Sequence, residues 1–381
     1  MMRRLWLYAI DHSLLLLVGA AVGIVWANVD LHSYEPLVHA LHFGVNDVGM
    51  AFFFALAAKE VVEATAPNGA LHSPRRAGMP LLAAVGGMAG PAVIFVALAI
   101  TTARRELLPG WAIPCATDIA FSYLTARLIF GAKHPAIPFL LLLAIADDAL
   151  GLAILAVFYP AGTLRLLEFV VLLGVAMGIA GGLRRRVRRS FWPYILGAGM
   201  VSWFAFFRGG LHPALALVPI IPLVPHAARD PGLFVETLGH DPLTKFEHQW
   251  KIPVQVVLFF FGLVNAGVPF ANTGVGTWIV LASIIVGKPV GILSFTALGV
   301  AVGLHRPAGV SWRDLLVVGN AAAIGFTVAL FFATAAFPPG GLLDETKMGA
   351  LLSFSAAGLA LGMARALGTG RFSATRVRPQ R

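Results

Sequence analysis

Three aspartates lie within two adjacent, strongly apolar segments, and this combination restricts the possible folds more than any other feature of the sequence. Together the segments cover residues 112–158, with Asp118 in the first and the neighbours Asp147 and Asp148 in the second. A carboxylate at the centre of a membrane helix costs roughly 2.5–3.5 kcal/mol on insertion scales. Three of them need compensating partners or a function, and ionisable groups at this depth indicate a pathway for ions or protons by default.

The chain is far more apolar than a soluble protein. Of its 381 residues, 58% are hydrophobic and 12% are charged, whereas charged residues make up about 25% of a soluble domain. The single cysteine, Cys115, excludes an intramolecular disulfide and a cysteine-based metal cluster. No nucleotide-binding glycine loop is present. We therefore predict an all-α integral membrane protein that contacts membrane lipid and needs no cofactor.

About twelve segments are long and apolar enough to be spanning helices, for which about 20 residues are needed. The first resembles a signal peptide because arginines precede it. Since Asp11 and His12 interrupt the junction and the apolar run continues, we interpret it as a retained helix. The eighth is short and rich in proline. The predicted spans cover residues 13–30, 45–66, 78–102, 109–130, 136–159, 163–182, 190–207, 211–224, 252–271, 276–303, 312–336 and 345–367.

The positively charged residues predict the orientation of these spans. The net charge of +10 comes from Lys and Arg that gather in short segments between helices, a pattern that indicates topology rather than nucleic-acid binding. With the N-terminus inside, 21 of the 28 Lys and Arg lie inside and five outside. We predict cytoplasmic termini, a topology anchor at Arg184 to Arg189, one membrane domain over residues 1–370 and a basic cytoplasmic tail over 371–381.

Two of the predicted spans are interrupted. Pro114 removes a backbone donor in the fourth span, and Gly319, Asn320 and Gly325 interrupt the eleventh. Each interrupted span is the second in a set of three, the third to fifth and the tenth to twelfth. Broken helices at corresponding positions in two halves of a chain are typical of an inverted-repeat transporter with its binding site near the membrane midplane.

Depth within the membrane decides which charged groups can cooperate. By helical rise, Asp118, the Asp147–Asp148 pair and Lys288 all lie near the middle of their predicted spans. Asp147 and Asp148 point about 100° apart on a helix, so one can face an ion cavity while the other faces a neighbouring helix. Lys288 is the one basic residue at this depth, and pairing it with an aspartate lessens the desolvation penalty of both. Lys288 is then either a structural counter-ion or a proton carrier.

The same residues explain how ions would be exchanged. Hard cations prefer oxygen ligands, and a partly dehydrated aspartate pair binds either a cation or a proton. Competition for the same oxygens is itself an exchange mechanism. Thr117 adds a hydroxyl beside Asp118, either as an ion-site neighbour or as a helix-capping residue.

Five segments carry a resemblance to a known family. In the same order and at similar spacing, they resemble the signature segments of the bacterial NhaA family of sodium/proton antiporters. The segments are Ala116 to Phe121, Ala144 to Gly151, Val264 to Val268, Val286 to Ile292 and Val317 to Thr327.

The resemblance implies specific roles. Asp148 matches the principal cation ligand and Asp147 the partner of Lys288, while Asp118 matches the aspartate that compensates the half-helix ends where two broken helices cross near the midplane. Thr117 matches an ion-site neighbour. The family exports Na+ or Li+ for more protons, electrogenically, in Na+ and pH homeostasis at the bacterial inner membrane, and it is not enzymatic. The implied moving core covers residues 78–159 and 276–367, and the scaffold covers 13–66 and 163–271.

The sequence departs from the family in regions that the resemblance links to pH sensing and dimerisation. In Ala58 to Ala64, Glu60 keeps its place, but Val62 and Glu63 replace a Lys-Arg pair; we interpret Lys59 as a lysine that extends its charged end to the surface. Glu247-His248 resembles the family's Glu-His, with His248 either part of a pH sensor or an ordinary interfacial histidine. The outer segment 31–44 is short for a dimerisation hairpin, so the sequence does not decide whether the protein forms a homodimer.

Two other functions compete. A sodium-coupled organic-solute carrier on the same fold has little need of adjacent buried aspartates and a buried lysine. An intramembrane aspartyl protease needs two facing aspartates on different helices, whereas Asp147 and Asp148 diverge on one helix, although Asp118 and Asp148 satisfy the requirement in principle. A protease would not respond to Na+ or Li+, and a symporter would not release protons when sodium is added.

Overall fold

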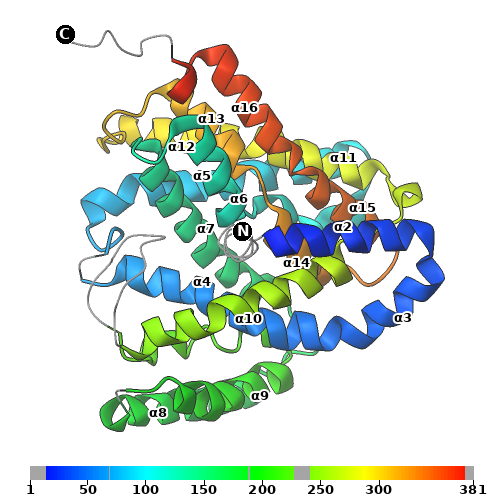
Figure 1. Cartoon of the computed structure of the whole chain (residues 1–381), viewed down its shortest axis with the longest axis vertical. Coiled ribbons are helices and arrows are strands. Elements are labelled where there is room, and N and C mark those ends of the chain that lie inside the picture. Colours follow the sequence, from blue (N-terminus) through cyan, green and yellow to red (C-terminus); the bar gives the residue numbers. More distant parts are fainter. Residues whose placement is uncertain (1–13, 68, 188, 227–240, 374–381) are drawn as a thin grey trace, which may run out of the picture. The chain divides into compact units, whose positions relative to one another are not determined.

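The described part of the chain is helical throughout. The computed structural model describes residues 14–67, 69–187, 189–226 and 241–373, and these contain α-helices, 3-10 turns and π turns but no strand (Figure 1). The junction at Asp11 and His12 and most of the predicted tail, residues 374–381, lie outside the described residues. The same is true of Arg188 in the predicted topology anchor.

Two compact units make up the chain, and each contains three separate stretches of sequence. Unit 1 comprises Met1–Ser73, Asp148–Asn272 and Phe331–Asp344, and unit 2 comprises Pro74–Asp147, Thr273–Leu330 and Glu345–Arg381. One boundary falls between Asp147 and Asp148, inside helix α7 (Ala136–Phe158). The division into a moving core and a scaffold stays a prediction.

Unit 1 is organised around helices that approach one another closely. On α2 (Leu14–Val29), added Cβ atoms at Gly19 and Gly23 would clash with backbone oxygens of α10 (Pro242–Asn265). These oxygens belong to Phe259 and Leu263. Small residues that let helix backbones approach are typical of membrane proteins. The elements of this unit are α2 (Leu14–Val29), α3 (Leu31–His42), η1 (Phe43–Gly49), α4 (Met50–Thr65), α8 (Leu166–Arg186), η4 (Tyr194–Gly199), α9 (Met200–Gly209), η5 (Pro213–Leu215), η6 (Ile221–Leu223), α10 (Pro242–Asn265) and η7 (Phe270–Asn272).

Unit 2 contains both interrupted segments that the sequence predicts. Helices α13 (Trp312–Ala322) and α14 (Phe326–Ala336) meet at an angle of 51°. The backbone is extended at Ala116 and Asp118, between η3 (Ile113–Cys115) and α6 (Ile119–Phe130). Helix α14 continues into unit 1, and α15 (Gly341–Leu352) begins there. The other elements are α5 (Pro74–Thr101), η2 (Arg105–Gly110), η3 (Ile113–Cys115), α6 (Ile119–Phe130), α11 (Val275–Ala282), η8 (Ser283–Gly287), α12 (Lys288–Ala301), α13 (Trp312–Ala322), α16 (Ser355–Leu367) and η9 (Gly370–Phe372).

Several helices are suited to cross a membrane. Among the described residues, six are long and apolar enough, or seven if the bent pair α13 and α14 forms one span. The chain is therefore a multi-pass membrane protein, and the number twelve stays a prediction. The eighth predicted span, residues 211–224, folds as the 3-10 turns η5 and η6 and contains no α-helix. Pro213, Pro219 and Pro222 explain this result, because each removes a backbone donor.

Two other segments have a defined local structure, and the second of them differs from the prediction. The outer segment 31–44 is mostly helical, since α3 continues through the π turn η1 into α4. In the eleventh predicted span, Gly319 and Asn320 lie inside α13, and the break comes at Ala323–Gly325. Gly319 instead allows close packing, since an added Cβ would lie 2.7 Å from Cα of Pro289.

Candidate functional site

A buried ion pair forms the centre of the candidate site. Lys288 and Asp147 are both buried, and Nζ of Lys288 lies 3.0 Å from Oδ2 of Asp147. Nζ also donates to the backbone oxygen of Cys115, the last residue of η3. That carbonyl belongs to a helix end, where acceptors lack partners within the helix. The lysine therefore neutralises a carboxylate and satisfies an interrupted backbone at the same time.

One oxygen of Asp147 takes no part in this pair. Oδ1 is buried and has no hydrogen-bond partner among the described residues. A buried carboxylate oxygen without a partner is costly unless a ligand, water or proton satisfies it. Asp147 thus combines one oxygen held by Lys288 with a second, buried oxygen that has no partner among the described residues.

Close packing between α5 and α12 fixes the position of Lys288. An added Cβ at Gly291 or Gly90 would clash with the backbone of the facing helix, and one at Gly287 would lie 2.5 Å from Cα of Pro91. Gly287 and Gly291 flank Lys288 with the four-residue spacing that lets membrane helices approach. The π turn η8 directly precedes Lys288, and such turns are frequent at functional sites.

Asp118 is fully engaged by helix ends. Its Oδ1 accepts from the backbone N of Phe121, at 3.4 Å, as the N-cap of α6. Its Oδ2 accepts from the backbone N of Thr327, at 3.4 Å, and from the Thr327 hydroxyl. Thr327 lies in the first turn of α14. The carboxylate therefore faces the N-termini of two helices, where negative charge is stabilising.

Thr117 connects the two interrupted segments. Its Oγ1 donates to the backbone oxygen of Ala322, at 3.2 Å, at the end of α13. The next residue, Asp118, donates its backbone N to the oxygen of Ile324 at 2.6 Å. The hydroxyl satisfies a carbonyl at a helix end, while Asp118 provides the N-cap of α6. A direct role of Thr117 at an ion stays a prediction.

Asp148 differs from its neighbour in burial. It follows Asp147 on α7 and is partly exposed, whereas Asp147 is buried. Consecutive helical residues point about 100° apart, so the two carboxylates face different surroundings. The role of Asp148 as principal cation ligand stays a prediction. No group of three or more His, Cys, Asp or Glu side chains that could hold a metal ion occurs in the described part of the chain.

The predicted surface lysine is in fact buried, which corrects the interpretation of Lys59. Its side chain is 5% exposed, and Nζ lies 2.7 Å from Oε2 of both Glu63 and Glu247 and 3.3 Å from Oε1 of Glu60. The lysine cannot extend to the surface because three carboxylates of unit 1 surround its ammonium group. Glu60 and Glu247 thereby come together around Lys59, and His248 follows on α10.

Two residues that contact Lys59 or Asp118, one in each unit, are not themselves predicted as site residues. Glu63 pairs with Lys59 at the (i, i+4) spacing of a helical ion pair, and this spacing is a signal that could have found it. Thr327 binds Asp118 across 209 residues of sequence. The only local feature that could have indicated a role for Thr327 is its position shortly after Gly325, at the second interruption.

Known proteins resemble this chain over nearly its whole length. The model of a family described as Na+/H+ antiporter 1 matches residues 8–364. A Na(+)/H(+) antiporter NhaA of Jannaschia sp. (strain CCS1) is 46% identical over 94% of this chain and 97% of that protein. One of Geobacter metallireducens is 45% identical over 94% of this chain and 96% of its own length. A third, of Pelobacter propionicus, is 46% identical over 95% and 98% of the respective chains.

Proposed function

The chain belongs to the Na+/H+ antiporter 1 family, and from this premise we propose that it exports Na+ or Li+ in exchange for protons. The single observation that carries this proposal is the buried Lys288–Asp147 pair, in which one oxygen of Asp147 has no partner among the described residues. We infer a location in the bacterial inner membrane with both termini cytoplasmic, twelve spans, and electrogenic exchange driven by the proton gradient.

Competition for carboxylate oxygens supplies the exchange mechanism. A cation reaching the site binds Asp148 and the available oxygen of Asp147, because hard cations prefer oxygen ligands. Protons that bind these oxygens release the cation. Lys288 keeps the second oxygen of Asp147 in place, and it is either a fixed counter-ion or itself gives up a proton when the cation binds. Since two aspartates serve one cation, more than one proton can return for each sodium.

The two interrupted segments serve as the frame of this site. We propose that they cross near the membrane midplane, with Asp118 compensating the helix N-termini and Lys288 compensating the carbonyl of Cys115. The support is the set of bonds from Asp118 to Thr327 and from Lys288 to Cys115. Backbone that is interrupted at membrane depth needs such internal partners.

The Lys59 cluster, defined as Lys59, Glu60, Glu63 and Glu247, is the proposed pH-sensing region together with His248. Three carboxylates share one ammonium group, so protonation of any of them changes the charge balance of the whole cluster. Replacing Glu63 by Gln is expected to move the pH at which exchange begins. Wild-type pH dependence in this variant would exclude Glu63 from the sensor.

The decisive experiment uses purified protein in liposomes with an acidic interior and a pH-sensitive dye. Addition of Na+ or Li+ outside is expected to dissipate the gradient, whereas K+ and choline are expected to have no effect. Asp148→Asn is expected to abolish the response. The matched control is Asp30→Asn, because Asp30 is an exposed N-cap of α3 and asparagine caps equally well.

The alternatives give distinct results in the same assay. A response of Asp148→Asn at the wild-type rate would remove Asp148 from the site. If no cation dissipates the pH gradient at any pH, the organic-solute carrier would be favoured, since fold alone does not determine function.

A further inference from the structure

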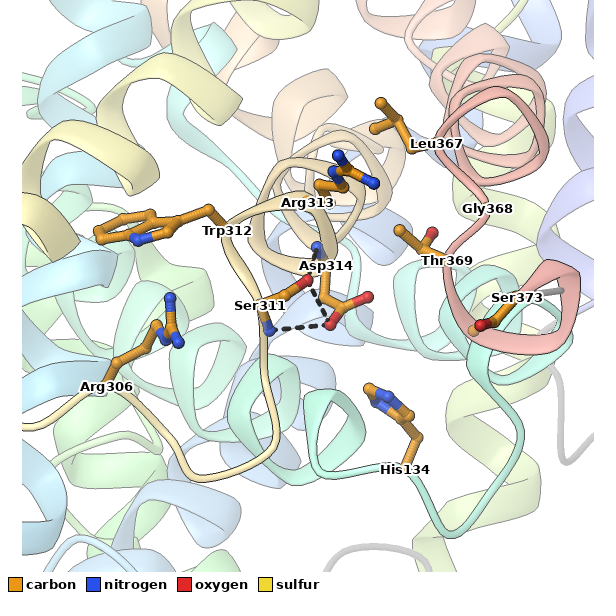
Figure 2. Close-up of a pocket in the computed structure, with 11 residues that line it drawn as sticks. His134, Arg306, Ser311, Trp312, Arg313, Asp314, Leu367, Gly368, Thr369 and Ser373 are labelled. Atoms are coloured by element: carbon orange, nitrogen blue, oxygen red, sulfur yellow. Dashed lines mark hydrogen bonds between the residues drawn. The ribbon is translucent and has the colours of Figure 1, made fainter. Parts of the chain in front are cut away.

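Unit 2 contains a cavity that the proposed exchange does not use. Its volume is about 570 Å³, and three connections of the unit line it. His134 comes from the turn between α6 and α7, Arg306 and Arg313 from the segment that joins α12 to the start of α13, and Thr369 from the segment after α16 (Figure 2). The distribution of Lys and Arg predicts this end of the unit to be cytoplasmic.

The charges around the cavity favour an anion with a single charge. Arg306 and Arg313 bring two guanidinium groups, and Asp314 brings one carboxylate. Oδ2 of Asp314 already accepts from the backbone N and the hydroxyl of Ser311, at 2.8 and 2.7 Å, as the capping box of α13 (Figure 2). The lining is therefore positive overall, while the carboxylate would repel an anion with several charges.

Two uncharged groups at the cavity add hydrogen-bonding capacity. Thr369 is 6% exposed, and its buried Oγ1 has no hydrogen-bond partner among the described residues. A buried hydroxyl requires a partner, and an anion oxygen in the cavity would supply one. Nδ1 of His134 accepts from the backbone N of Ala136 at 3.2 Å, so the neutral ring carries its proton on Nε2 and presents a donor there.

An aromatic side chain supports a position of this cavity near the edge of the membrane. The Arg306 guanidinium lies 5.5 Å from the centre of the Trp312 ring, and Trp312 is 42% exposed. Tryptophan is enriched at the depth of lipid headgroups. Guanidinium groups bind phosphate oxygens through two parallel hydrogen bonds.

We propose that this cavity binds a singly charged phosphate group and that a membrane phospholipid supplies it. Arg306, Arg313 and Thr369, which line the cavity, supply the donors that would hold the phosphate. The site is independent of ion exchange, so an Asp148→Asn variant retains it.

Thermal unfolding of the full-length protein in detergent tests this proposal. Short-chain phosphatidylglycerol and inorganic phosphate are titrated separately, and native mass spectrometry counts the retained lipid. In Arg306→Gln, the lipid concentration for half-maximal protection is expected to rise at least about tenfold, because a charge-assisted hydrogen bond is lost. The matched control is Arg365→Gln, since Arg365 stacks on Phe372 and does not line the cavity.

Thr369→Val separates binding from folding. Without lipid, this variant is expected to be as stable as the wild type or more stable, because it replaces an unpartnered hydroxyl by a methyl group. With lipid, it is expected to gain less stability than the wild type. Equal protection of both cavity variants and the wild type would overturn the site, as would an equal loss in Arg365→Gln. Protection by inorganic phosphate as strong as by lipid would overturn the lipid assignment.

Discussion

Asp118 and Asp147 are both buried aspartates of unit 2, yet their carboxylates have different surroundings. Both oxygens of Asp118 accept hydrogen bonds at the N-termini of α6 and α14. Asp147 gives one oxygen to Lys288, and its other oxygen has no partner among the described residues. The comparison teaches that two buried carboxylates can differ in their second oxygen, and from this difference we expect a structural role for Asp118 and a chemical role for Asp147.

Loss of Lys288 is expected to have the largest effect on stability. Lys288→Ala leaves the Asp147 carboxylate buried without its cation, which is expected to lower the free energy of unfolding by about 3–5 kcal/mol. Thermal unfolding in detergent measures this change. The double variant Lys288→Met with Asp147→Asn removes both charges and is expected to recover most of the stability while exchange stays absent. If Lys288→Ala were as stable as the wild type, this result would contradict the central role of the Lys288–Asp147 pair.

Asp118→Ala is expected to cause the second-largest loss of stability. It removes the N-cap of α6 and the bonds to Thr327, together worth about 2–4 kcal/mol. Asp118→Asn keeps an acceptor for the cap and is expected to lose roughly half as much. Thermal unfolding of both variants in detergent measures the two losses of stability. If Asp118→Asn folds normally and lacks all exchange, Asp118 has a chemical role and the contrast with Asp147 breaks down.

Thr327→Val sharpens the description of Asp118 as a structural carboxylate. Valine has a similar shape but cannot donate to Oδ2, so the free energy of unfolding is expected to fall by about 1–3 kcal/mol. The matched control on the same helix is Thr334→Val, because Thr334 bonds only the local backbone oxygen of Phe331 in the described structure. Equal unfolding temperatures for the two variants would remove Thr327 from the support of Asp118.

The smallest expected effect on stability belongs to Asp148→Asn. Because Asp148 is partly exposed and asparagine has nearly the same shape, unfolding is expected to change by no more than about 0.5 kcal/mol. Exchange in liposomes is nevertheless expected to disappear. A large loss of stability would show that Asp148, like Asp118, supports the fold.

Membrane depth predicted that Lys288 pairs with a buried aspartate, and the family resemblance assigned Asp147 as that partner. Asp147 and Lys288 are ionisable groups near the middle of apolar segments, and desolvation in the membrane demands that such groups find each other. Two residues with local signals were also placed correctly at interruptions, since Pro114 and Gly325 lie in or beside the breaks. Sequence patterns predicted these features because one physical requirement, the desolvation of charge or the interruption of a helix, determines each of them.

Tertiary partners explain the failures. The sequence predicts Lys59 at the surface, because a lysine near a helix end usually extends outward, but Glu247 from a distant helix completes a carboxylate shell around it. Thr327 carried no signal of its bond to Asp118, because that contact arises only when α6 and α14 begin at the same place. The sequence predicts a break at Gly319, but this glycine lies inside α13 and allows close packing against Pro289.

The π turn that precedes Lys288 makes the direction of this lysine depend on chain length as well as residue identity. A π turn closes its hydrogen bonds over one more residue than an α-helical turn. Deleting one residue within Ser283–Gly287 would restore α-helical pairing and rotate α11 by about 100° relative to Lys288. Insertions and deletions here are therefore expected to be more damaging than substitutions.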